Sequence, residues 1–156
     1  MPNYKGHLVG GFIAYAIVVY ILLYLMIIYV PSITTAIEWL LFTLAGSLFP
    51  DVDIKSKGQK LFYRTMFGIT LLLILKQRFE LLILVMVLSF IPLLVRHRGI
   101  FHNFWFIMML VGTVTCTLTI YYPAHAHIIT TDALFFITGI ISHLWLDLGL
   151  KRMLRL

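Results

Sequence analysis

The stretch LVGGFIAYAIVVYILLYLMIIYV, residues 8–30, decides the fold class of this chain. It runs for 23 residues without a charged side chain, and an α-helix of about 20 apolar residues crosses the hydrocarbon core of a bilayer. The stretch therefore predicts a membrane-spanning helix. It is too long for the apolar region of a signal peptide and no small-x-small cleavage site follows it, so we expect it to be retained.

The composition extends this prediction to the whole chain. Of its 156 residues, 62% are hydrophobic and 12% are charged, with a mean hydropathy of +1.01. Only helices and closed barrels span a bilayer, because backbone polar groups find no water there. The apolar runs are continuous rather than alternating, which favours helices over a barrel. We therefore predict an all-α polytopic membrane protein with a single integral membrane domain, residues 1–156.

Polar breaks divide the chain into a bundle of about six transmembrane helices. The expected spans are residues 8–30, 33–49, 61–75, 81–95, 104–122 and 132–150. The third and fourth runs are short; if they form one re-entrant unit, the number of spans falls toward four. We expect Thr130, Thr131 and Asp132 to cap the start of the last span, and residues 51–60 to form a polar loop.

Six spans place both termini on one side of the membrane. Ten basic residues fall on that terminal side, and only Lys76 and Arg78 fall on the other. Because cytoplasmic loops carry an excess of lysine and arginine, we predict that both termini are cytoplasmic. The ten are Lys5, Lys55, Lys57, Lys60, Arg64, Arg96, Arg98, Lys151, Arg152 and Arg155.

The net charge of +6 does not indicate a nucleic-acid partner. The basic residues flank apolar runs, where cytoplasmic anchoring and anionic headgroups explain them. We therefore expect membrane lipids as partners and no direct nucleic-acid binding. The single cysteine, Cys116, excludes an intrachain disulfide and a cysteine-rich zinc site.

The sequence RHRGIFHN, residues 96–103, places two histidines and two arginines between the fourth and fifth spans. The predicted topology brings other metal-binding residue types to the same side. His143 and Asp147 share one face of the last helix, roughly 12 Å and 6 Å from Lys151 along its axis. Ionisable groups at that depth are costly unless they are paired or functional. The seven candidate metal ligands are His7, Asp51, Asp53, His97, His102, His143 and Asp147.

Imidazole and carboxylate groups together suit zinc, manganese or iron(II), and we expect zinc or manganese. Seven ligands are enough for two ions, which can clamp a phosphoryl group and activate water. Asp51 and Asp53 are either ligands or catalytic bases. Arg96 and Arg98 are either membrane anchors or groups that bind substrate anions.

Four motifs of this chain together resemble the YdjM-type family: Gly6-His7, LFPDVD (48–53), RHRGIFHN (96–103) and SHLWLD (142–147). Its members are described as inner-membrane, metal-dependent hydrolases, some of them LexA-binding or LexA-regulated. The resemblance implies a multi-pass protein of a bacterial or archaeal cytoplasmic (inner) membrane, a divalent-metal site formed by the seven residues above, and a link to LexA. Phe101 and Asn103 stand where the family commonly has hydroxyl residues.

Four classes of function fit these residues. The leading one is a membrane-embedded hydrolase that depends on a divalent metal and acts at the cytoplasmic face on an amphiphilic phosphoester such as a lipid. The second is a non-enzymatic protein whose structural metal or polar core joins four spans. In the third, His102 and His143 are axial haem ligands, which the nearby aspartates disfavour. In the fourth, the buried histidines and aspartates carry a metal ion or protons across the membrane.

Overall fold

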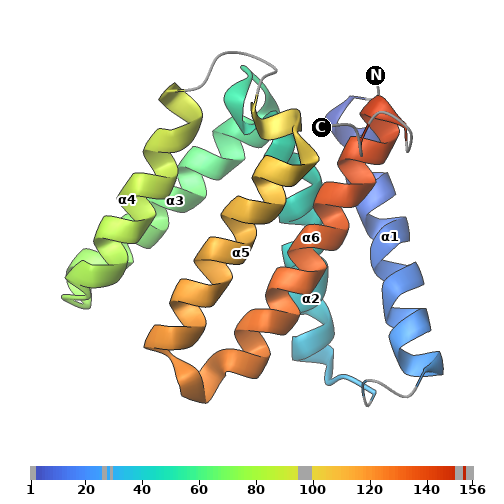
Figure 1. Ribbon diagram of the computed structural model, residues 1–156, viewed down its shortest axis with the longest axis horizontal. Coiled ribbons are helices and arrows are strands. Elements are labelled where there is room, and N and C mark those ends of the chain that lie inside the picture. The colour runs from blue at the N-terminus through green and yellow to red at the C-terminus, as the bar shows by residue number, and fades with distance from the viewer. Residues whose placement is uncertain (1–2, 26–27, 29, 95–99, 150–152, 154–156) are drawn as a thin grey trace.

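The computed structural model describes residues 3–25, 28, 30–94, 100–149 and 153 (Figure 1). In these residues the chain is helical and contains no strand, which confirms the all-α membrane bundle. The α-helices are α1 (Tyr4–Tyr24), α2 (Ile33–Leu48), α3 (Lys57–Leu75), α4 (Phe79–Leu94), α5 (Phe104–Tyr121) and α6 (Ala126–Leu148). Short 3-10 turns are η1 (Phe49–Asp53), η2 (Ile100–His102) and η3 (Pro123–His125).

Four described segments are long and apolar enough to cross a membrane: α1, α2 with η1, α5, and η3 with α6. The start of α1 and the end of α6 lie at the same end of the bundle, together with η1 and η2 (Figure 1). The charge bias of the sequence predicts that this end faces the cytoplasm, and it is called the cytoplasmic end below. The metal-ligand candidates on η1, η2 and the end of α6 therefore share one end.

The last helix begins at Ala126, six residues before the expected start, so the predicted cap at residues 130–132 is wrong. The hydroxyls of Thr130 and Thr131 instead donate to the carbonyls of Ala126 and His127, each at 2.8 Å. A threonine whose hydroxyl bonds to a carbonyl one turn back can lie inside a helix. A threonine in the sequence is therefore an ambiguous sign of a helix start.

Two other boundaries differ from the sequence-based expectation. The first helix begins at Tyr4, where Asn3 caps it, and it ends at Tyr24 rather than at residue 30. The expected loop 51–60 is largely helical, because η1 continues to Asp53 and α3 begins at Lys57 after the cap Ser56. As a result, His7 lies inside α1, and Asp51 and Asp53 lie on an ordered turn.

Helices α3 and α4 pack against each other as a hairpin (Figure 1). At the cytoplasmic end η1 contacts the hairpin. At the other end Arg78, in the hairpin turn, donates a hydrogen bond to the hydroxyl of Tyr122 and lies 5.4 Å from its ring centroid. The hairpin turn therefore contacts the residue that follows α5. Neither α3 nor α4 is among the four long apolar segments.

Helices α2 and α6 run parallel and touch along their backbones. Gly46 lies against the carbonyl of Phe136, and Gly139 lies against the carbonyl of Thr43. A Cβ atom at either glycine would overlap that carbonyl oxygen. In lipid, small residues at helix interfaces permit this close approach. The contact sets how the two helices are placed along each other.

Helix α1 packs against both α2 and α6. A Cβ at Gly10 would lie 2.6 Å from Leu146 Cδ1, and one at Gly11 would lie 2.8 Å from Ser47 Cβ. On the other side of α6, α5 contributes Ile107 and Val111 to an apolar core shared with Leu144. Three helices therefore fix α6 in position.

Replacing Gly139 by alanine should destabilise the bundle by about 1–3 kcal/mol or more, because the new methyl group has no free space against α2. Thermal unfolding of the detergent-solubilised protein measures the change. The matched control is Gly112→Ala on α5, where a Cβ meets nothing within 4 Å and a helix-stabilising effect is expected. Equal Tm values for the two variants would contradict the backbone contact.

Candidate metal centre

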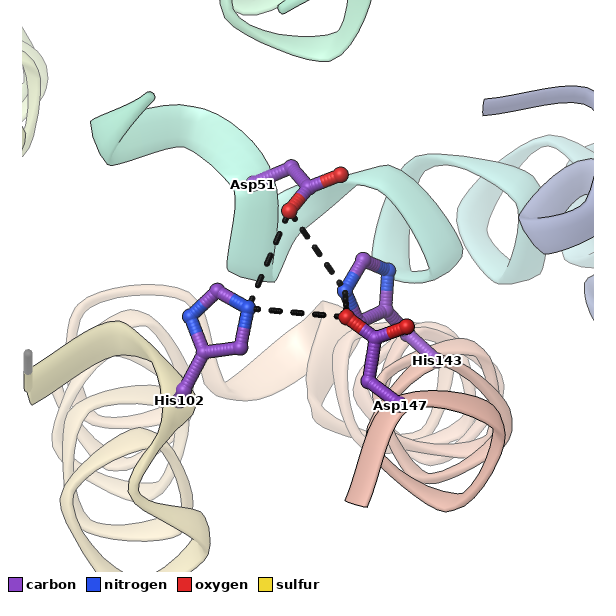
Figure 2. Close-up of side chains that lie close together, drawn as sticks. All are labelled: Asp51, His102, His143 and Asp147. Atoms are coloured by element: carbon purple, nitrogen blue, oxygen red, sulfur yellow. Dashed lines mark ion pairs between the residues drawn. The ribbon is translucent and has the colours of Figure 1, made fainter. Parts of the chain in front are cut away.

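Four side chains from three segments lie close together and point toward one another (Figure 2). Asp51 comes from η1, His102 from η2, and His143 and Asp147 from the last turns of α6. One ligand atom from each lies within 4.8 Å of all the others. Residues distant in sequence thus form one polar cluster, and this group could hold a metal ion.

The distances inside the cluster are too long for hydrogen bonds and suit a shared ion. His143 Nε2 lies 3.6 Å from Asp147 Oδ2 and 3.7 Å from Asp51 Oδ1. His102 Nε2 lies 3.9 Å and 3.7 Å from the same two oxygens. Two ligands about 2.0–2.2 Å from one tetrahedral ion are separated by about 3.3–3.6 Å. The cluster therefore has nearly the spacing of a coordination shell.

The ring orientation of His143 is fixed by a backbone carbonyl. Its Nδ1 lies 2.7 Å from the carbonyl oxygen of Ser47, so Nδ1 carries the proton and donates it. Pro50 has no N–H with which to continue the 3-10 turn onto that carbonyl. Nε2 is then left with a free lone pair that points toward Asp51 and Asp147. Such an outer contact is typical of metal-ligating histidines.

His7, on α1, contacts the four-residue cluster. Its ring stacks on that of His143, with centroids 3.8 Å apart and an angle of 15° between the planes. Its Nε2 lies 3.5 Å from Asp147 Oδ1, the carboxylate oxygen that does not face His102 and His143. Asp147 therefore has imidazoles on both of its oxygens.

Most of the buried side-chain atoms that lack a hydrogen-bond partner belong to residues predicted as metal ligands. Among the described residues there are seven such side-chain atoms, and six of them belong to His7, Asp53, His102, His143 and Asp147. A buried polar group without a partner costs about 1–3 kcal/mol, and native proteins contain few of them. Two of these atoms face other groups of the site: His143 Nε2 faces Asp51 and Asp147, and Asp147 Oδ1 faces His7. A positively charged group bound there would give both atoms a partner.

Asp53 is buried, with both carboxylate oxygens unpartnered, but it is not one of the four clustered residues. The other predicted site residues, Arg96, His97 and Arg98, lie outside the described residues. Of the seven predicted ligands, the structure thus brings together Asp51, His102, His143 and Asp147, places His7 in contact with them, and buries Asp53 nearby in sequence.

The two departures from the usual family motif have structural roles. Phe101 is fully buried and packs edge-on against Phe49 at 5.6 Å and Phe106 at 5.8 Å. Asn103 caps α5, because its side chain accepts a hydrogen bond from the Phe106 backbone N–H at 3.1 Å. Serine and threonine cap helices in the same way, so asparagine preserves this function and orients η2.

Sequence reasoning missed the carbonyl of Ser47, which orients His143. A backbone acceptor has no sequence signal of its own. The only available hint was Pro50, which removes an N–H that would otherwise compete for nearby carbonyls.

The fold and the site together define a multi-pass membrane protein with a partly buried His/Asp cluster that could hold a metal ion. The YdjM inner membrane protein family matches residues 1–155. The chain therefore belongs to this family and is a multi-pass inner-membrane protein. No curated protein and no solved structure matches it.

Divalent metal should stabilise the protein strongly, because the ion removes repulsion between buried lone pairs and carboxylates. Zn²⁺ or Mn²⁺ at 100 times its Kd should raise the free energy of unfolding of chelator-treated protein by about 3 kcal/mol. The variant Asp147→Asn should lose most of that shift in thermal melts. The control Glu38→Gln, at an exposed carboxylate of α2, should keep it. A Tm of the native protein that does not change when metal is added would contradict a metal site.

Proposed function

We propose that this protein is a divalent-metal-dependent hydrolase that cleaves an amphiphilic phosphoester, in particular a lipid, at the cytoplasmic face of the inner membrane. The cluster of buried, unpartnered imidazole and carboxylate atoms carries the proposal. Asp51, His102, His143 and Asp147 form a group that could hold a metal ion. The donor set of nitrogen and oxygen supports zinc or manganese.

The depth of the site supports a lipid substrate. Trp145 lies between His143 and Asp147 in sequence, within about 3 Å of each along the helix axis. Its side chain is 59% exposed, whereas His143 is fully buried. Tryptophans on membrane helices prefer the headgroup level. A lipid phosphate would therefore lie at the same depth as the ligand atoms.

Each residue of the site has a proposed role in the hydrolysis. A bound divalent ion supplies Lewis acidity and an activated water. Asp51, His102, His143 and Asp147 hold it, and the Ser47 carbonyl keeps the proton of His143 on Nδ1. Asp53, whose buried oxygens have no partner, is proposed as the general base or as a ligand of a second ion. Arg96 and Arg98 are proposed to bind the substrate anion, as the sequence suggested.

A haem is a poor occupant of this site. The imidazoles of His102 and His143 would have to face each other across an open macrocycle plane. The carboxylate oxygens of Asp51 and Asp147 lie within 4.8 Å of both imidazoles, so that space is already filled by hard oxygen ligands.

His102→Ala and His143→Ala should each lower phospholipid hydrolysis about 100-fold or more and reduce bound metal. Purified protein is assayed against a panel of phospholipids, with metal content measured by mass spectrometry. His127→Ala is the matched control, because His127 is exposed at the opposite end of α6. Native protein without stoichiometric metal would refute the proposal. Bound metal with no hydrolysis across the panel would instead favour the structural metal that joins α1, η1, η2 and α6.

A second ion is the natural explanation for His7. One oxygen of Asp147 faces His102 and His143, and the other faces His7. His7 and Asp147 would therefore hold a second ion, which would help to stabilise the charge of one phosphoryl group. His7→Ala should then reduce the metal content from two ions to one, while His127→Ala leaves it unchanged. A native content of one ion per chain would contradict this role of His7.

A further inference from the structure

A contact between the first turns of α1 and α3 lies on the cytoplasmic side of the metal ligands. Lys57 Nζ donates a hydrogen bond of 3.0 Å to the hydroxyl of Tyr4 and lies 4.4 Å from the centroid of its ring. Lys5, Lys55 and Lys60 make no side-chain hydrogen bond or ion pair in the part of the chain that the structure describes. Holding a lysine in one place costs up to about 2 kcal/mol of side-chain entropy. Lys57 therefore differs from an ordinary membrane-anchoring lysine.

The contact is attached to the site at both of its ends. Tyr4 precedes His7 by three residues, so the two side chains share a face of α1 and Tyr4 lies about 4.5 Å nearer the cytoplasm. Lys57 follows Ser56, whose hydroxyl donates to the backbone carbonyl of Asp51 at 3.0 Å. The Tyr4–Lys57 pair thus connects the helix that carries His7 with the segment that carries Asp51.

The chemistry of the pair suits an anion. The ammonium group of Lys57 has three N–H donors, and Tyr4 uses one of them. The Tyr4 hydroxyl accepts that bond and keeps its own proton as a donor. The four clustered residues bring two carboxylates, Asp51 and Asp147, which repel a phosphate that approaches. The Lys57 ammonium adds a positive charge next to Ser56, which is hydrogen-bonded to the Asp51 backbone, and lysine binds phosphate as a point charge.

We propose that Lys57, held in place by Tyr4, binds the anionic oxygens of the substrate phosphate where it enters the metal centre from the cytoplasmic headgroup layer. This inference rests on the proposed function, because the phosphate matters only if the centre acts on it. Tyr4 is a positioning residue and adds one donor.

The test measures the affinity of the full-length, detergent-solubilised, Mn²⁺-loaded protein for inorganic phosphate by titration calorimetry. Lys57→Met should raise the phosphate Kd about tenfold, the loss expected for one charge-assisted hydrogen bond. Tyr4→Phe should raise it about threefold, and Lys57→Arg should restore it to within about threefold of native. Lys60→Met, an exposed lysine one turn further along α3, is the matched control and should leave it unchanged. Metal content should stay native in all four variants.

Three results would overturn the inference. Equal losses in Lys57→Met and Lys60→Met would show a diffuse charge effect. A lower Tm with an unchanged phosphate Kd in Lys57→Met would show that Lys57 only stabilises the packing of α1 against α3. Metal-loaded native protein that binds no phosphate would also overturn it. Native protein that binds no metal would refute the proposed hydrolase itself, so the two failures are separable.

Discussion

The backbone contact between α2 and α6 is the constraint on which the rest of the structure depends. Gly46 and Gly139 each lie against a carbonyl of the opposite helix, so the two helices can take few positions along each other. In this register Ser47 reaches His143, and Trp39 stacks on Phe135 with centroids 4.7 Å apart. In a bilayer, where apolar surface does not drive helices together, such close packing and interhelical hydrogen bonds hold a bundle.

The metal centre follows from where α2 ends. Pro50 stops the helix and tightens the chain into η1, and this turn directs Asp51 toward the end of α6. Phe101 anchors η2 in a group of aromatic rings that includes Phe49, and so delivers His102 to the same place. Apolar packing beneath the site therefore positions polar groups that would repel one another if they were left without an ion.

The burial of these groups opposes the stability of the fold. His7, His143 and Asp147 lie almost wholly out of contact with solvent, with lone pairs that no protein donor satisfies. Each such atom costs free energy in a medium of low polarity. Strained or unsatisfied groups that persist at one site are typical of functional centres rather than of packing. The stability of this bundle and the chemistry of its site are thus physically linked.

The sequence by itself determined that this is an all-α membrane protein with both ends on one side, because hydropathy, chain length and charge bias act locally and need no tertiary contact. It also indicated which residue types belong to a metal site. The sequence did not predict the helix starts at Tyr4, Lys57 and Ala126. A serine or threonine that caps a helix and one that bonds to a carbonyl one turn back inside a helix look the same in a sequence. Only the tertiary structure decided that Asp51, His102, His143 and Asp147 share one point and that the Ser47 carbonyl orients His143. Those facts depend on the register of α2 against α6. Glycine contacts and backbone hydrogen bonds set this register, and no periodic sequence pattern reveals such contacts.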